Sequence, residues 1–368
     1  MREYCLKWKL EVNVSKTKII VFNSNRRLSH RFNFGTESID IVTSFRYLGI
    51  EFSQSGTFFK ARKSIYDHAQ RAIFSLLQTA RKQELPLCII LDMYQKMIVP
   101  ILTYGCEIWG HENLDILEKL QMKFLKMVFR LNRQTMSAMI LGELGIYPIS
   151  VLIKCRMMRF WSGIIDNSST NKISSRLYSI LFNLCAHKEL VSKWLNNIQS
   201  ILVENGYDCV WSSQFIYNKG YFRKNIDISI KQNFIKSWEH ALEESTKCIF
   251  YKSIKGEFCR EQYIKQLPDA LIFPLIKFRC GNHKLQIEIG RREGEVRGDR
   301  VCRECSMNSL GDEFHFILQC PKFTLLRNEF IPKKYRSCIS MFNLCNLFRG
   351  NRNHQVKLSK FIKKSKVV

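Results

Sequence analysis

Four residues near the C-terminus have the types and the spacing of metal ligands. Cys302 and Cys305 are separated by two residues, and His315 and Cys320 are separated by four. A CxxC pair can bind one metal ion from a tight turn, and a His–x4–Cys pair can complete the tetrahedron from the first turn of a helix. This pattern predicts a structural zinc site formed by Cys302, Cys305, His315 and Cys320.

Buried thiols beside an unrelated histidine, or disulfides, are the alternatives in a chain with 14 cysteines. The first residues, MREYCLKWKLEV, carry charges where a secretory signal needs an apolar run. We therefore expect reduced thiols and a protein that is not secreted. Cysteines with apolar neighbours are expected in the core, as for Cys88, Cys106, Cys155 and Cys280.

The composition indicates the class of partner. The chain has 58 Lys and Arg against 32 Asp and Glu, a formal net charge of +26 that favours a polyanion, and RNA and DNA are the first candidates. Hydrophobic residues make up 46% of the 368 residues, which is enough for a packed core in two or three domains.

The most apolar stretch does not predict a membrane span. Asp92, Gln95 and Lys96 interrupt LPLCIILDMYQKMIVPILTYGC before the roughly 20 apolar residues that a bilayer requires. We expect no membrane partner. Basic runs such as Lys360 to Lys366 permit nuclear entry, so we expect the protein in the nucleus, the cytoplasm or both.

The elements that must position these residues change type along the chain. Apolar runs between residues 10 and 56, with turn signals at Gly35-Thr36 and from Ser53 to Gly56, predict strands. From residue 57 the apolar residues recur at helical spacing, as in Ile65, Ala69, Ala72, Ile73, Leu76, Leu77 and Ala80.

A second predicted helix carries two stripes. Its apolar stripe consists of Leu114, Leu117, Leu120, Phe124, Leu125, Val128 and Leu131. Its basic stripe consists of Lys119, Lys123, Lys126, Arg130 and Arg133. A basic stripe is either solvated surface or a surface that follows a phosphate backbone, and the pattern alone leaves both open.

The rest of the chain is less specific. Residues 151 to 270 are expected to be helical, with the core candidates Trp194, Ile198, Val203, Phe234, Trp238 and Leu242. The tail KLSKFIKKSKVV is either a basic arm for nucleic acid or a frayed end.

Several motifs in order resemble the C-terminal part of a non-LTR (LINE-type, jockey-like) retrotransposon reverse transcriptase, across most of the chain. The matching runs are LEVNVSKTKIIVF, FRYLGIEFS, LPLCIILDMYQKMIVPILTYGCEIWG, LEKLQMKFLKMVFRL, MILGELGIYPIS and the cysteine-containing FRCGNHKLQIEIGRREGEVRGDRVCRECSMNSLGDEFHFILQCPKF. The resemblance implies the end of a polymerase palm, a helical thumb and a zinc-bearing tail.

The resemblance also implies roles for matching residues. Lys16 matches a motif lysine that protonates the departing pyrophosphate, although without the rest of the palm we interpret it as a surface lysine. Phe45, Tyr47, Leu48 and Gly49 match the hairpin that grips the primer end, with strand core as the alternative. The basic stripe would lie on a thumb helix along the template–primer duplex.

The departure from the family concerns catalysis. Such polymerases hold two Mg²⁺ ions with closely placed aspartates, and this sequence contains no Asp-Asp pair. We expect the ligands for Mg²⁺ to be absent. The adjacent acidic pairs Glu243-Glu244 and Asp312-Glu313 are interpreted as solvated surface and as support for the zinc ligands.

These patterns predict a mostly α-helical α+β fold with a palm remnant at residues 1–56, a helical thumb at 57–150, a helical connector at 151–270 and a zinc-binding module with a basic tail at 271–368. The favoured function is a truncated reverse transcriptase that is inactive alone and retains binding to RNA and DNA. The alternative is a zinc-dependent interaction protein with a host protein partner. A further interpretation is one piece of a mispredicted gene.

Overall fold

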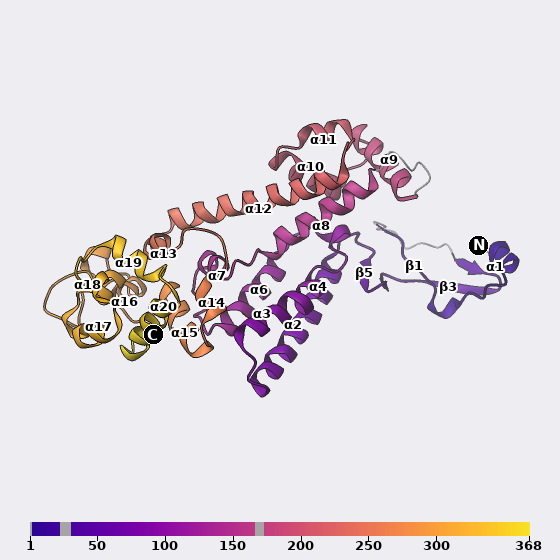
Figure 1. Cartoon of the computed structure of the whole chain (residues 1–368). Helices are drawn as coiled ribbons and strands as arrows, with labels where there is room; N and C mark the ends of the chain where they lie inside the picture. The colour runs from indigo at the N-terminus through magenta and orange to yellow at the C-terminus, as the bar shows by residue number, and fades with distance from the viewer. Residues whose placement is uncertain (1, 23–30, 166–172) are drawn as a thin grey trace.

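The protein is mostly helical, with two small sheets close to its N-terminus. The computed structural model describes residues 2–22, 31–165 and 173–368. The two termini lie at opposite ends of an elongated molecule (Figure 1). The predicted mostly helical α+β class is therefore confirmed, whereas the assignment of its parts to a palm and a thumb stays a prediction.

The first sheet has three strands in the order β1-β3-β2. It follows helix α1 (Arg2–Lys7) and consists of β1 (Lys18–Ile19), β2 (Phe32–Phe34) and β3 (Glu37–Ile41). Strand β1 is parallel to β3, and β2 pairs with β3 in the antiparallel sense. Gly35 has a φ of +67° in the turn between β2 and β3, which confirms the predicted turn.

The second sheet is the antiparallel hairpin of β4 (Ser44–Tyr47) and β5 (Ile50–Ser53). Leu48 and Gly49 both have positive φ angles, 46° and 82°, which is the geometry of a two-residue hairpin turn that matches the strand twist. The sequence FRYLGIEFS therefore forms a hairpin, as its resemblance to the primer-gripping motif implied, whereas its apolar pattern alone predicted one strand run from Phe45 to Phe52.

A helical body follows, in which α2 (Phe59–Lys82) packs against α4 (Val99–Leu102) and α6 (Asp115–Val128). Its other helices are α3 (Leu87–Met93), the π-helical segment Tyr94–Ile98, α5 (Cys106–Trp109), α7 (Ser137–Leu144) and α8 (Ile149–Ile164). The apolar stripe of α6 is buried from Leu117 to Val128, and the ring of Phe124 stacks on Tyr94 at 4.5 Å between centroids. Burial of each such side chain contributes about 1.5–3 kcal/mol, so this stripe fixes α6 in the body.

Residue Gln121 of α6 determines where α8 begins. Its side-chain amide donates to the carbonyl of Tyr147 at 3.0 Å, and its side-chain oxygen accepts from the amide of Ile149 at 3.2 Å. A buried helix start needs partners for its free amides, and Gln121 supplies one.

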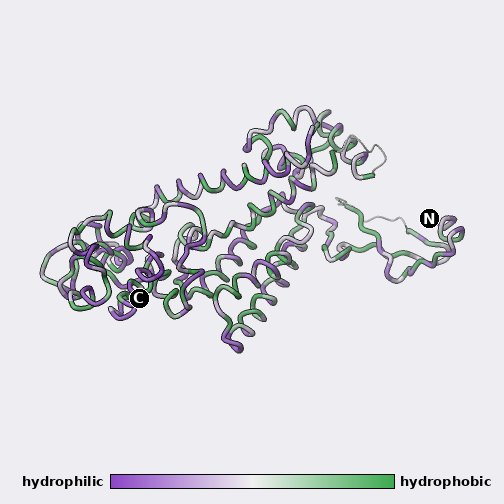
Figure 2. Tube along the Cα trace, viewed as in Figure 1, coloured by the Kyte–Doolittle hydropathy of each residue, from purple (hydrophilic) through white to green (hydrophobic). Residues whose placement is uncertain are grey.

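The helical body is followed by the helices α9 (Ile173–Ala186), α10 (Lys193–Glu204), α11 (Asp208–Ser213) and α12 (Lys219–Glu244). Helix α12 packs along α8, alternates hydrophilic and hydrophobic residues along its length, and reaches the C-terminal helices (Figures 1 and 2). Of the predicted core residues, Ile198, Trp238 and Leu242 are buried, and Trp194 and Phe234 are partly buried. The prediction for Val203 is wrong, because this side chain is 54% exposed on α10.

The C-terminal part is a compact group of short helices around phenylalanine rings. They are α13 (Ile249–Ile254), α14 (Gln262–Gln266), α15 (Asp269–Arg279), α16 (Gln286–Arg292), α17 (Thr324–Phe330), α18 (Lys333–Arg336), α19 (Met341–Phe348) and α20 (Arg352–Lys364). Helix α20 packs against α15 and α17, and its Leu358, Phe361 and Ile362 are buried. The tail is therefore a packed helix, so the prediction of a frayed end is wrong, whereas its predicted binding to nucleic acid stays a prediction.

A buried ionic network joins the helical body to this C-terminal group. Arg279 of α15 donates to both carboxylate oxygens of Glu143 of α7, each at 2.9 Å, and Tyr263 donates to Glu143 at 2.6 Å. Glu261 lies 3.3 Å from Arg279 on its other side. Because Glu143 and Arg279 are both buried, each charge depends on the other for compensation.

Three of the four cysteines that were expected in the core are there. Cys106, Cys155 and Cys280 are buried, whereas Cys88 is exposed at the start of α3 because the apolar neighbours Leu87, Ile90 and Leu91 occupy the inner face. Among the described residues, no single helix has both the length and the apolar character of a membrane span, although α7 and α8 taken together, bent by 64°, meet the criteria of length and composition.

Candidate functional site

The first pair of predicted metal ligands lies on a short loop that the main chain closes. Val301 pairs with Leu310 in an antiparallel bridge, and the amide of Cys302 donates to the carbonyl of Ser309 at 2.8 Å. A Cβ atom at Gly311 would lie 2.8 Å from Gln286 Cβ and 3.1 Å from Cys302 Cα, so any larger residue would force the returning chain away. The loop thus presents Cys302 and Cys305 from one tight turn.

The second pair lies on one π-helical turn, His315–Gln319. The amide of Cys320, the residue that ends this turn, donates to the carbonyl of His315 at 2.7 Å. A π-helical bond joins residues five positions apart, which is the separation of the two ligands in the sequence, and such turns are frequent at functional sites. The predicted helix turn is confirmed, with Cys320 at its end.

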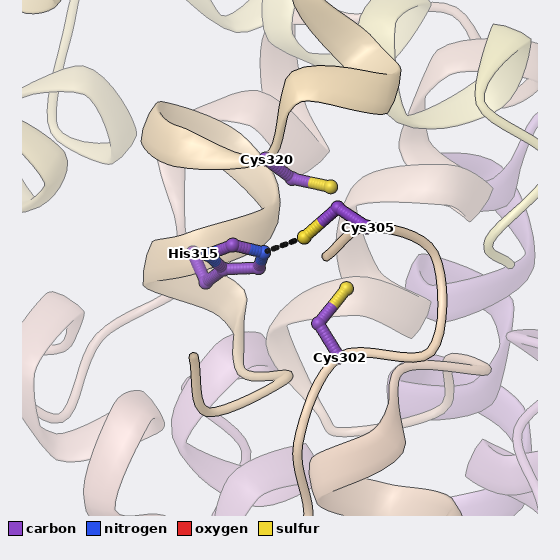
Figure 3. Close-up of side chains that lie close together, drawn as sticks. All are labelled: Cys302, Cys305, His315 and Cys320. Atoms are coloured by element: carbon purple, nitrogen blue, oxygen red, sulfur yellow. Dashed lines mark hydrogen bonds between the residues drawn. The ribbon is translucent and has the colours of Figure 1, made fainter. Parts of the chain in front are cut away.

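The structure brings the four predicted ligands together. One ligand atom from each of Cys302, Cys305, His315 and Cys320 lies within 4.8 Å of the others, and Cys305 Sγ is 3.3 Å from His315 Nε2 (Figure 3). In a tetrahedral zinc site with Zn–S bonds of about 2.3 Å, sulfur atoms are about 3.7 Å apart. Three thiols and one imidazole at these separations are a set of donors that can hold a zinc ion.

The thiols of the cluster have pKa values shifted from the ordinary value. Burial raises the pKa of the Cys320 thiol to about 12 and raises that of Cys302, whereas the amide of Met307 lowers the pKa of Cys305. A buried thiol with a raised pKa becomes a thiolate at neutral pH only when a cation lies beside it. His315 is buried, and within the described chain its Nδ1 has no hydrogen-bond partner.

Two residues outside the cluster fix the turn that carries His315 and Cys320. Asp312 accepts a hydrogen bond of 2.9 Å from the amide of His315, as the interpretation of the Asp312-Glu313 pair expected, whereas Glu313 lies 3.1 Å from His283 Nε2. Arg327 of α17 is buried and donates to the carbonyls of Ile317 and Cys320, both at 2.7 Å. The sequence analysis missed Arg327, because one arginine in LLRNEF gives no local sign of burial.

The five basic residues of the predicted stripe line one groove of about 860 Å³. The groove runs along α6 and is closed by the segment after α6, by α7 and by Pro148. Its lining also includes Met122, Leu131 and Leu141. Asp115 and Glu118, in the first turn of α6, also line it, at the end of the helix where the dipole favours acidic side chains.

The placement of these basic residues differs in part from the prediction. Lys119 and Lys123 are exposed on α6, but α6 ends at Val128, so Arg130 and Arg133 belong to the following loop. Arg130 has a φ of +53°, a left-handed conformation that ends the helix, and its guanidinium lies 4.5 Å from the ring centre of Phe273. The prediction that the basic stripe lies on one helix is therefore wrong for Arg130 and Arg133, although all five basic residues line the same groove.

Residue Lys126 is the least accessible of the five. Its Nζ donates to the carbonyl of Arg133 at 2.7 Å, and burial lowers its pKa. Lys126 thus fixes the loop that brings Arg130 and Arg133 back over the groove.

The hairpin that matched the primer grip is attached to the helical body by two neighbouring residues. Tyr104 Oη donates to the carbonyl of Leu48 at 2.7 Å, and a Cβ atom at Gly49 would lie 3.2 Å from the Tyr104 ring. Tyr47 is 59% exposed, and Phe45 is half-buried and faces Phe52 in the other strand. Gly49 is therefore required both for the turn and for the approach of Tyr104.

Residue Lys16 is exposed in a single 3-10 turn, Val14–Lys16. The side chain of Asn13 accepts a hydrogen bond from the main-chain amide of Lys16. The strands of this N-terminal region lie at the opposite end of the molecule from the zinc-ligand group (Figure 1). The structure thus keeps the hairpin, the groove and the metal cluster on three separate parts of the chain.

Comparisons with protein-family models, with curated proteins and with solved structures give no match for this chain.

Proposed function

We propose that the chain binds nucleic acid through the basic groove and that the Cys302, Cys305, His315 and Cys320 cluster holds a structural zinc ion. The proposal includes the ancestry that the motifs indicate: a relative of non-LTR retrotransposon reverse transcriptases. The expected ligands are RNA, DNA and their hybrid duplex.

One observation carries this proposal. Five basic side chains from one helix and the loop after it line a single groove of about 860 Å³. Lysines on an ordinary solvated surface repel one another and are dispersed. A phosphate backbone is a linear array of negative charges, so it binds favourably to a row of cations. The formal net charge of +26 adds a long-range attraction for any polyanion.

One cation of the groove is held by an aromatic ring. Arg130 lies against Phe273 at 4.5 Å, so its planar guanidinium is held in place and its donors are directed. The apolar lining from Met122 and Leu131 suits the sugar and base surfaces between phosphates. Contacts to the backbone alone imply little sequence preference.

The zinc ion would have a structural role. Three thiols and one imidazole complete a tetrahedron and leave no coordination position for a substrate. The ion would join the loop at Cys302 and Cys305 to the turn that ends at Cys320, within the group of helices that also contains α15 and α20.

We do not propose polymerase activity for the chain alone. The sequence has no Asp-Asp pair, and its adjacent acidic residues have other partners: Glu243 pairs with Lys252 at 3.0 Å, and Glu313 lies 3.1 Å from His283 Nε2. Two-metal phosphoryl transfer needs carboxylates that are free to hold Mg²⁺.

The experiment is a binding and primer-extension assay on one purified sample. A fluorescent RNA–DNA hybrid with a recessed primer is titrated with the protein, and extension with deoxynucleotides and Mg²⁺ is followed in parallel. The proposal predicts saturable, salt-sensitive binding and no extension. A lack of binding at low salt overturns the nucleic-acid function, and templated extension overturns the expected inactivity.

A further inference from the structure

A second, smaller cavity lies on the other side of the loop that closes the groove. Its volume is about 190 Å³, and its lining includes Asn132, Gln134, Lys247, Arg291 and Arg292. Arg133, between Asn132 and Gln134, lines the groove instead, so the loop separates two basic sites. We call this cavity the loop pocket.

The wall of the loop pocket is held by one asparagine. Asn282 Oδ1 accepts from the amide of Asn132 at 2.7 Å and from the hydroxyl of Thr135 at 3.0 Å. Thr135 is buried, and Gly281 has a φ of +66° where the chain turns after α15. The pocket is therefore formed by ordered main chain from both the helical body and the C-terminal group.

Three cations converge on the pocket from two segments of the chain. Lys247 lies in the 3-10 turn Thr246–Cys248, and Arg291 and Arg292 end α16. Burial, followed by the charges of Arg291 and Arg292, lowers the pKa of Lys247. Like charges that crowd a half-buried site raise its free energy, and a bound anion would relieve this cost.

The donors of the pocket are only partly used within the chain. The ammonium of Lys247 has three N–H donors, and the carbonyl of Gln134 takes one at 2.9 Å. Glu288 forms an ion pair with Arg291 but is itself buried and does not line the pocket. Among the residues that the structure describes, the lining contains three cations, amide groups and one hydroxyl, and no carboxylate.

We propose that the loop pocket binds a single phosphate group, held by Lys247, Arg291 and Arg292. A cavity of about 190 Å³ accommodates one such group with a few waters, each of about 30 Å³ in the liquid. Guanidinium and ammonium groups are the donors that bind phosphate most strongly. The site is separate from the groove and does not depend on the function proposed for it.

A phosphate group of this kind comes either from a small phosphate ester or free phosphate, or from a strand end of nucleic acid. Two probes distinguish the sources: orthophosphate, titrated by calorimetry, and a pair of identical oligonucleotides with a 5′-phosphate or a 5′-hydroxyl. The variants are Lys247→Gln, which removes the charge and keeps an N–H donor, and Arg292→Gln at an exposed position. The control is Lys357→Gln, an equal change of charge on exposed α20 surface.

We expect one orthophosphate site per chain, with affinity about tenfold lower in either pocket variant and unchanged in Lys357→Gln. A preference for the 5′-phosphorylated strand that both pocket variants lose assigns the site to strand ends, and orthophosphate binding without that preference assigns it to small phosphates. The proposal is overturned if the protein shows neither saturable phosphate binding nor a preference for the 5′-phosphate. It is also overturned if Lys357→Gln causes the same loss as the pocket variants. Thermal melting shows whether the variants are folded.

Discussion

The main-chain amide of Cys320 donates a hydrogen bond of 2.7 Å to the carbonyl of His315, five residues earlier. This one bond defines the π-helical turn and places the imidazole and the thiol on the same side of the chain (Figure 3). An α-helical turn would bond residues four apart and would rotate one of the two ligands away from the loop that carries Cys302 and Cys305.

Removal of a ligand should remove the metal. Cys305→Ser and His315→Ala are expected to lower zinc content and to speed amide exchange around residues 298 to 323, because binding of the ion and folding of its loop are coupled. Exchange in α2 and α6 should not change. Cys338→Ser, at an exposed cysteine, is the control. Full zinc occupancy in both ligand variants would show that the ligands are different residues.

Substitution of Arg327 should weaken zinc binding although Arg327 is not a ligand. Arg327→Met removes the donor to the carbonyl of Cys320 and leaves two buried carbonyls without it, so we expect zinc affinity to fall about 10- to 100-fold. Competition with a chromogenic chelator measures the affinity. Arg71→Met, at an exposed position on α2, should have no effect. If Arg327→Met retains wild-type affinity, the arginine does not position Cys320.

The sequence predicted the four residues of the Cys and His cluster but not the buried arginine beside it, for a physical reason. Ligand types and their local spacing are set within about 20 residues, whereas the burial of Arg327 depends on how α17 packs against the π-helical turn. The packing of α20 had a local signal, because Leu358, Phe361 and Ile362 recur at helical spacing between the lysines. The tail was nevertheless interpreted from its lysines, as a basic arm or a frayed end. The end of α6 had no glycine or proline to mark it, so the stripe was extended through Arg133.

Breaking the buried ionic network should destabilise the junction between the helical body and the C-terminal group. Glu143→Gln is expected to lower the free energy of unfolding by about 3–5 kcal/mol, because it leaves Arg279 as a buried charge without its main partner. The double variant Glu143→Leu with Arg279→Met should be less destabilised than Glu143→Gln alone. Urea unfolding measures both. Equal stability of wild type and Glu143→Gln would contradict the role given to this pair.

The imidazole of His111 should make stability depend on pH. Burial lowers its pKa below the usual 6.5, so the folded state binds fewer protons than the unfolded state as the pH falls through 6.5. Stability from this group is therefore present above pH 6.5 and is lost progressively below it. Urea unfolding at pH 7.5 and pH 5.5 should show a larger loss for wild type than for His111→Asn. Equal losses would contradict this assignment.

The central claim, that the basic groove binds nucleic acid, is tested most directly by the salt dependence of binding after charge reversal. Lys119 and Lys123 are the suitable pair, because both are exposed, whereas Lys126 supports the loop at Arg133. The control is Lys357→Glu with Lys360→Glu, the same change of charge on α20.

Each phosphate contact releases about one counterion, so Lys119→Glu with Lys123→Glu should weaken binding to an RNA–DNA hybrid and reduce the slope of log affinity against log salt by about two. The α20 pair should lower affinity slightly and leave the slope unchanged. If the groove variant binds the hybrid as tightly as wild type with the same slope, the groove is solvated surface and the nucleic-acid function is wrong.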